Sequence, residues 1–293
     1  MPKLIVMVGE SGSGKSTRAN EILAEGLASG RKIVRVNMDN IREMFFGKDS
    51  SWDIRLKGHN AKLVGQVEKH CATLGLNSGF DVIIDDINLS DRAQNSWKQF
   101  AGTYDEVELE FVRMDTPFEV CVQRDAARHG REHVGRAVIE RQFLTSGRAQ
   151  FGTKPIVICD LDGTLFGHEG VRSPFDETQV HRDWPYTVVM DWVDELAKDN
   201  SIVLVSGRHA SCGDGTMQAL ANYGVPYDHL LMRNSGDNRP DTVVKQELLN
   251  GMLKCGVTKK QITCVLDDRP KVIRMWKENG LKVYPVRGQV EEF

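Results

Sequence analysis

The sequence lacks the marks of a membrane protein, of a disulfide-stapled secreted protein and of a strongly basic nucleic-acid binder. Its first apolar run, residues 4–8, is far too short for a signal sequence or a membrane span, so a strand is expected there. The six cysteines form no Cys-x-x-Cys pair and no zinc-like spacing with histidine, which predicts buried, reduced thiols in a cytoplasmic protein. The net charge of −3 predicts no general attraction to nucleic acid, so any such affinity must be local.

The sequence does have the composition and periodicity of an α/β protein with two domains. Its 293 residues are 40% apolar and 27% charged, which is enough for two cores. Short apolar runs alternate with helical stretches, so each half is expected to be a doubly wound parallel sheet. A stretch rich in Gly, Ser, Lys and Pro, residues 145–155, is the expected linker between domains at 1–150 and 151–293. The expected strands are residues 4–8, 33–36, 82–84, 107–112, 156–159, 202–205 and 262–266.

A glycine-rich motif at residues 9–16 follows the first expected strand and precedes a helix. It has the pattern of a phosphate-binding loop, in which glycines let successive N–H groups face phosphate oxygens at a helix N-terminus. Lys15 is expected to reach the phosphates of ATP or another NTP, and Ser16 to bind Mg²⁺. A glycine-rich turn without a ligand is the alternative. The expected nucleotide-binding residues are Gly9, Ser11, Gly12, Ser13, Gly14, Lys15, Ser16, Thr17, Arg124 and Arg128.

The segment after the second expected strand carries a candidate acceptor site. Asp39 can take a proton from an attacking hydroxyl, and Arg42 lies where it can bind an acceptor phosphate. The alternative role for Asp39 is a helix N-cap. After the next strand, Asp85 or Asp86 could contact Mg²⁺ through water or orient the acceptor. Asp86 is favoured, and a solvated loop pair is the alternative.

Arginines are concentrated in residues 124–148, which hold six of them against three acids. Arg124 and Arg128 lie four residues apart, on one face of a helix. Such arginines can close over the donor phosphates and stabilise charge in the transition state. A solvated basic helix is the alternative.

The second half begins with Asp160-x-Asp162 at the end of an expected strand, where ligands bind in open α/β folds. Asp160 is the expected nucleophile, forming an aspartyl phosphate, and Asp162 the expected general acid and base. Ser206, Lys245 and the pair Asp267-Asp268 follow in order at later strand ends or helices. Ser206 would donate to the phosphate and Lys245 would offset its charge. The expected Mg²⁺ ligands here are Asp160, Asp162, Asp267 and Asp268.

Too few residues separate Gly163 from the helix expected near Tyr186 for a large cap domain. The cap is therefore expected to be minimal, and the site open to a bulky substrate. Arg172 and Arg208 are candidate phosphate ligands, with a purely structural role as the equal alternative.

Taken together, these motifs resemble the bacteriophage-type bifunctional polynucleotide 5′-kinase/3′-phosphatases, in which a P-loop kinase precedes a haloacid-dehalogenase-type phosphatase. The resemblance covers essentially the whole chain and includes the motifs at residues 172–176, 206–208, 241–245 and 267–269. It implies transfer of the γ-phosphate of an NTP to a 5′-OH of RNA or DNA. It also implies removal of a 3′-phosphate or 2′,3′-cyclic phosphate. In this family Asp39 is the general base, Arg42 an acceptor ligand, Arg128 a donor-phosphate ligand and Asp241 an essential acid.

The resemblance also implies RNA or DNA ends as partners, while a ligase acting downstream and a homo-oligomer both stay open. Two departures are Glu10 inside the phosphate loop and Asn40 after Asp39, which leave donor and acceptor preferences open. A small-molecule kinase fused to a metabolite phosphatase is the runner-up. A binding module with degenerate catalytic folds is a third interpretation, although no expected catalytic residue is missing.

Overall fold

The first apolar run is strand β1 (Lys3–Val8), an inner strand of a four-stranded parallel sheet with the order β2–β3–β1–β4. Alternate residues of β1 face opposite sides of this sheet. Leu4 and Val6 belong to one core cluster, and Ile5 and Met7 to another. The other strands are β2 (Ile33–Val36), β3 (Asp81–Ile84) and β4 (Glu108–Arg113).

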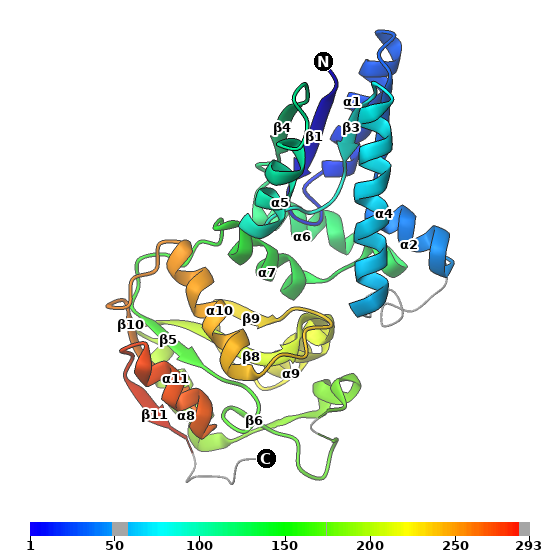
Figure 1. The fold of residues 1–293 in the computed structure, drawn as a ribbon. Helices are drawn as coiled ribbons and strands as arrows, with labels where there is room; N and C mark the ends of the chain where they lie inside the picture. Colours follow the sequence, from blue (N-terminus) through cyan, green and yellow to red (C-terminus); the bar gives the residue numbers. More distant parts are fainter. Residues whose placement is uncertain (49–57, 174, 287–293) are drawn as a thin grey trace. The chain divides into compact units, whose positions relative to one another are not determined.

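Helices cover both faces of this sheet (Figure 1). α1 contributes Ala19 and Ile22 to the cluster on one face, while α2, α4 and α5 supply the other cluster. The unit is therefore doubly wound, as expected. The helices are α1 (Lys15–Ala28), α2 (Met38–Phe46), α4 (Gly58–Asn77), α5 (Asp91–Ala101) and α6 (Phe118–Ala126).

The second series of strands forms a five-stranded parallel sheet with the order β11–β10–β5–β8–β9. Val157 and Cys159 face one core cluster, and Ile156 and Ile158 the other, because helices again cover both faces. The strands are β5 (Ile156–Cys159), β8 (Ser201–His209), β9 (His229–Arg233), β10 (Ile262–Asp267) and β11 (Val283–Pro285). The helices are α7 (Arg136–Ser146), α8 (Thr187–Ala197), α9 (Gly213–Asn222), α10 (Asp241–Lys254) and α11 (Pro270–Glu278), with short 3₁₀ turns η1 (Gly130–Glu132) and η3 (Ala210–Cys212).

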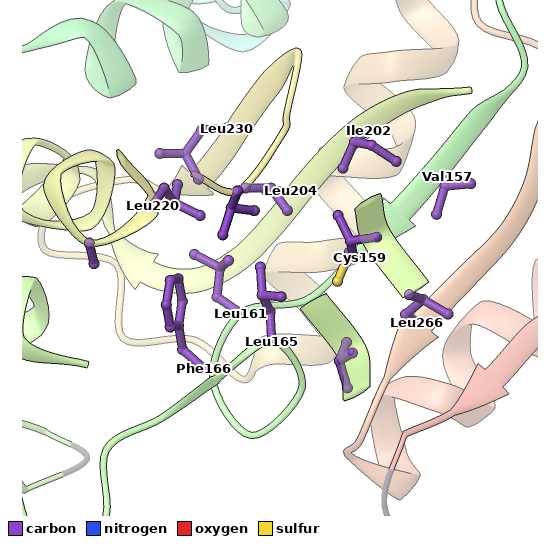
Figure 2. Close-up of a cluster of buried hydrophobic side chains, with 14 of the residues drawn as sticks. Val157, Cys159, Leu161, Leu165, Phe166, Ile202, Leu204, Leu220, Leu230 and Leu266 are labelled. Atoms are coloured by element: carbon purple, nitrogen blue, oxygen red, sulfur yellow. The ribbon is translucent and has the colours of Figure 1, made fainter. Parts of the chain in front are cut away.

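The segment after β5 folds back into the core. Leu161, Leu165 and Phe166 pack against strands β5 and β8 in the cluster drawn in Figure 2. Between Gly163 and Tyr186 the described residues form β6 (Phe166–Gly167), η2 (Glu177–Arg182) and β7 (Trp184–Pro185). The antiparallel pair β6–β7 and one 3₁₀ turn stand where a cap domain would be inserted.

The structure, a computed structural model, describes residues 1–48, 58–173 and 175–286, so Pro174 of the 172–176 motif lies outside it. The chain divides into two units, Met1–Arg128 and His129–Phe293, and α7 belongs to the second because it packs on β9, α9 and α10. No described helix is both long and apolar enough to span a membrane. All six cysteines are free, but the expectation that they are buried is wrong for Cys71, which is exposed on α4, and only partly right for Cys212 and Cys255.

Candidate active sites

The phosphate loop joins β1 to α1 in a conformation that only glycine adopts easily. Gly14 has a φ of 91° and Gly12 a φ of 75°, both in the left-handed region. A Cβ on Gly12 would lie 2.3 Å from the carbonyl oxygen of Cys121. Gly14 is the N-cap of α1 and has no side chain to cap it, and the first N–H groups of the helix lie at its positive end. Such an end binds an anion.

Lys15 and two arginines surround this loop. Lys15 Nζ lies 3.3 Å from the carbonyl oxygen of Glu10, and Arg124 Nη1 lies 3.3 Å from that of Gly12. Burial lowers the pKa of Lys15, and Arg128 lowers it further, while Asp85 and Asp86 oppose that shift. Arg128 is therefore close enough to act on the Lys15 ammonium. Ser16 and Thr17 lie in the first turn of α1.

The acceptor segment begins at the end of β2, where Asn37 caps α2. The Asn37 side chain accepts the Asn40 N–H at 3.0 Å, so the alternative role of Asp39 as the N-cap is wrong. Asp39 instead lies in the first turn with its side chain 63% exposed, and it accepts a hydrogen bond from Arg42 Nη1 at 2.6 Å. The structure thus places a carboxylate and a guanidinium together at this helix start.

The two acids after β3 have different environments. Asp85 is buried and accepts a hydrogen bond from Arg35 Nε at 2.9 Å. Asp86 accepts the Met38 N–H at 3.1 Å, and burial raises its pKa. The alternative of a solvated loop pair is therefore wrong, because both carboxylates are held within the fold.

Asp160 lies directly after β5 in a buried cluster of opposite charges. Lys245 Nζ, from α10, is 2.8 Å from Asp160 Oδ1 and 2.8 Å from Asp267 Oδ2 at the end of β10. Burial raises the pKa of Asp160, while Lys245 opposes the rise. Trp276 Nε1 also donates to Asp267 at 3.1 Å. Lys245 thereby compensates two carboxylates in the core, which would otherwise repel each other.

Three carboxylates form a cluster that suits a hard cation. One oxygen each from Asp160, Asp267 and Asp268 lies within 4.8 Å of the others. Gly163 is required beside it, because a Cβ there would lie 2.2 Å from Asp268 Oδ2. Oxygen ligands of this kind fit Mg²⁺. The Asp162 carboxylate, also expected as a ligand, lies outside this cluster.

Asp162 is instead held by the two arginines that the sequence left ambiguous. Arg208 donates to both Asp162 oxygens at 2.8 Å, and Arg172 Nη2 donates to Oδ1 at 2.9 Å. Burial pushes the pKa of Asp162 up, but Arg208 and then Arg172 bring it below its ordinary value. Asp183 accepts from both arginines, at 2.7 and 2.6 Å, and so fixes them from the other side. Both guanidiniums therefore lie beside Asp162.

Ser206, in β8, and Asp241, the first residue of α10, belong to a hydrogen-bonded network next to this cluster. Asp241 pairs with Arg233 and Arg269, and Arg233 Nε donates to the carbonyl oxygen of Gly207 at 2.6 Å. The buried Ser206 Oγ accepts the Arg208 N–H at 3.2 Å. This arrangement holds the segment that carries Arg208.

Sequence reasoning missed Asp183 and Arg233. Asp183 stands alone before β7, and Arg233 ends β9, a strand that was not expected. Neither lies in a motif, so only the fold shows that Asp183 contacts Arg208 and that Arg233 contacts the neighbouring Gly207.

Comparison with known proteins also divides the chain in two, with the boundary between residues 148 and 154. Residues 154–290 match the family model "Polynucleotide kinase PNKP phosphatase domain", and residues 4–148 match the model "AAA domain". A protein of Autographa californica nuclear polyhedrosis virus, described as a bifunctional polynucleotide kinase/RNA ligase, is 29% identical over 298 residues. The match covers 94% of this chain but 41% of that relative.

Two further likenesses are more limited. The adenylyl-sulfate kinase of Aeromonas hydrophila is 31% identical over 124 residues, which are 42% of this chain and 59% of that protein. A chain of the Pnkp1/Rnl/Hen1 RNA repair complex is 27% identical, with a TM-score of 0.43 and coverage of 98% of this chain and 96% of that one.

Proposed function

Because the chain belongs by its two domains to the bifunctional polynucleotide kinase–phosphatases, we propose that it heals the two ends of a nucleic-acid break. The N-terminal unit transfers the γ-phosphate of ATP or another NTP to a 5′-OH end. The C-terminal unit removes a 3′-phosphate or 2′,3′-cyclic phosphate. The observation that carries this proposal is the pairing, in one chain, of a phosphate loop with the Asp39–Arg42 pair and an Asp160–Lys245–Asp267 cluster. The two reactions act at different positions, so neither undoes the other.

In the kinase reaction, Asp39 takes the proton of the 5′-hydroxyl as its oxygen attacks the γ-phosphorus. The bond from that phosphorus to the bridging oxygen breaks, and the nucleoside diphosphate leaves. Arg42 holds the Asp39 carboxylate at 2.6 Å and binds the acceptor phosphate. Lys15, Arg124 and Arg128 offset the charge on the transferred phosphoryl group.

In the phosphatase reaction, an Asp160 oxygen attacks the 3′-phosphorus and the ester bond to the leaving 3′-oxygen breaks. Asp162 gives that oxygen its proton, then takes one from the water that hydrolyses the aspartyl phosphate. A phosphate entering between Arg208 and Arg172 competes for their hydrogen bonds to Asp162, so Asp162 can take a proton from solvent and then give it to the leaving oxygen in the acid step. The two arginines lower the pKa of Asp162, which suits the base step that follows, when the carboxyl has already lost that proton.

Mg²⁺ belongs to the proposal at both sites, where it would neutralise phosphate charge when bound. Asp160, Asp267 and Asp268 would hold it in the phosphatase, and Ser16 in the kinase. The Ser206 hydroxyl donates a hydrogen bond to the phosphate. Lys245 holds the Asp160 carboxylate in position for attack through its 2.8 Å contact.

We also propose that the ends are RNA and that a ligase receives them. The name of the viral relative joins a polynucleotide kinase to an RNA ligase, and this chain spans 41% of its length. A ligase activity on the healed ends would correspond to the part of the relative that this chain does not match.

Kinetics on four oligonucleotides test the proposal, namely RNA and DNA with a 5′-OH and RNA and DNA with a 3′-phosphate. Wild-type turnover of both end types supports it, with RNA preferred. Lys15→Ala should lose only the kinase reaction, and Asp160→Asn only the phosphatase reaction. Turnover of adenylyl sulfate or free nucleosides with none of any oligonucleotide would instead establish the small-molecule interpretation, which the Aeromonas relative favours for the N-terminal unit.

A further inference from the structure

Helix α4 buries a glutamate where its pattern calls for an apolar residue. Its buried positions are Val64, Glu68, Ala72 and Leu76, spaced by four along the face that packs on the sheet. Glu68 is 2% exposed. Burying a carboxyl group costs free energy unless it finds a partner, so an apolar side chain would be cheaper for folding alone. The position points to a role beyond filling the core.

The neighbour of Glu68 is Asp86, and each of the two carboxyls acts on the other. Glu68 Oε1 and Asp86 Oδ2 are both buried and find no donor group among the described side chains and backbone, a need that one proton shared by the two carboxyls would meet. Burial raises the pKa of both carboxyls, which keeps that proton in place. Asp86 Oδ1 is used separately, accepting the Met38 N–H at 3.1 Å.

That N–H belongs to the first residue of α2, next to the candidate acceptor groups. Asp39 follows Met38 directly, and Arg42 lies one helical turn on, with Nη2 3.7 Å from Met38 Sδ. The Arg42 charge also acts on both carboxyls of the pair. Its Nε is buried and has no acceptor in the described part of the chain. The helix start is thus tied to α4 through Asp86.

We propose that Glu68 is a positioning residue of the kinase site, whose carboxyl holds Asp86 against the Met38 N–H and so fixes Asp39 and Arg42 toward the acceptor. The inference rests on the proposed kinase function of this unit. Glu68 contacts neither the phosphate loop nor the acceptor in this scheme. It acts through the first turn of α2, where a displacement of about 1 Å can cost up to a hundredfold in rate.

Three variants test it. Glu68→Leu fills the same space but cannot bond to Asp86, and Glu68→Gln keeps an N–H donor for Asp86 without a carboxyl proton. The control is Asp81→Asn, a buried acid at the opposite end of β3, which bonds to the Lys3 N–H at 2.8 Å and pairs with Arg31. Asp81 and Asp86 are five residues apart in extended chain, or roughly 16 Å.

We expect Glu68→Leu to lower kcat/KM for the 5′-OH oligonucleotide by about tenfold, with KM for ATP within about twofold of wild type. Glu68→Gln should recover most of this loss. Asp81→Asn should leave both constants near wild type. The 3′-phosphatase rate of each variant serves as an internal measure of folding. A Glu68→Leu protein with unchanged acceptor kinetics overturns the inference, as does one that loses kinase and phosphatase activity in proportion.

Hydrogen exchange of the backbone keeps the test independent of catalysis. Peptides covering α2 should exchange faster in Glu68→Leu than in wild type or Glu68→Gln, while peptides covering α1 stay unchanged. Unchanged α2 exchange would contradict the positioning role even if the enzyme proved to phosphorylate another acceptor. Absence of any 5′-OH kinase activity in wild type would instead count against the proposed function, and the exchange result would still decide the role of Glu68.

Discussion

The two candidate sites differ in how they handle charge. The C-terminal site holds two buried ion pairs, in which Lys245 Nζ lies 2.8 Å from Asp160 and 2.8 Å from Asp267. The phosphate loop of the N-terminal unit instead offers the backbone N–H groups at the start of α1. The difference extends to the candidate proton-transfer groups. Asp162 is clamped by Arg172 and Arg208, while Asp39 is 63% exposed with one arginine beside it. One site has its charges balanced within the folded chain, and the other relies on loop geometry.

The chemistry proposed for each site explains this contrast. A carboxylate nucleophile must be kept near other carboxylates, and a buried lysine offsets their repulsion. A nucleotide, by contrast, brings several negative charges, for which a glycine loop and a helix N-terminus need only offer donors. Substitutions should therefore harm the C-terminal site through charge and the N-terminal site through shape.

The largest effect is expected from Asp160→Asn. The amide cannot form the aspartyl phosphate, so 3′-phosphatase turnover should fall by about 10⁴-fold or more, while the 5′-kinase rate stays within about twofold. Steady-state assays on 3′-phosphate and 5′-OH oligonucleotides measure both. Phosphatase turnover near the wild-type level in this variant would show that Asp160 is not the nucleophile.

Next is Lys245→Met, which leaves Asp160 and Asp267 uncompensated in the core. Removing one partner of a buried ion pair costs about 3–5 kcal/mol, so urea unfolding of this unit should shift strongly, and phosphatase activity should be lost. Lys254→Met, at the exposed end of the same helix, is the control and should cost less than about 1 kcal/mol. Similar unfolding curves for the two variants would show that the cluster contributes no charge compensation.

Strands β1 to β5, β8 and β10 could be predicted because most of them are buried parallel strands, which read as plain apolar runs, whereas β9 and β11 were not expected. That Asp160 and Asp267 lie together with Lys245 could also be predicted, since ligand groups gather at the carboxyl ends of such strands. Tertiary partners could not. Asp183 and Arg233 carry no local signal, and their roles come from contacts with residues 25 and 26 positions away.

The predicted role of the arginine-rich segment stays open for a similar reason. Arg124 and Arg128 lie by the phosphate loop, but Arg141 lies in α7 of the other unit, 3.7 Å from Glu247. The density of arginines along the sequence could not show that Arg124 and Arg128 belong to one unit and Arg141 to the other. The proposed domain boundary at residue 150 meets the same difficulty, because α7 precedes it and yet packs on the C-terminal sheet.

A smaller effect, in the N-terminal unit, should come from Gly12→Ala. Both Gly12 and Gly30 have positive φ, 75° and 77°, so alanine at either strains the backbone by about 1 kcal/mol. Only at Gly12 would the added methyl group meet another backbone, 2.3 Å from the carbonyl oxygen of Cys121, whereas nothing lies within 4 Å at Gly30. Kinase kcat/KM should therefore fall by roughly tenfold or more for Gly12→Ala alone. Equal kinase rates in the two variants would show that loop shape does not matter.

The smallest effect concerns a half-buried pair beside the phosphatase site. His209 Nδ1 lies 2.9 Å from Glu177 Oε2, and this hydrogen bond raises the pKa of His209 above 6.5. Because the folded pKa is raised, the stabilisation from the charged imidazole is fully present below pH 6.5 and is lost as the pH rises through the folded value. NMR titration of the ring should show this shift in wild type and a lower pKa in Glu177→Gln. Glu195→Gln, an exposed acid paired with Lys198, should leave it unchanged. If the pKa of His209 did not change in Glu177→Gln, the hydrogen bond to Glu177 would not be the cause of the raised pKa. Charge balance by fixed partners would then not extend to this pair of the C-terminal unit.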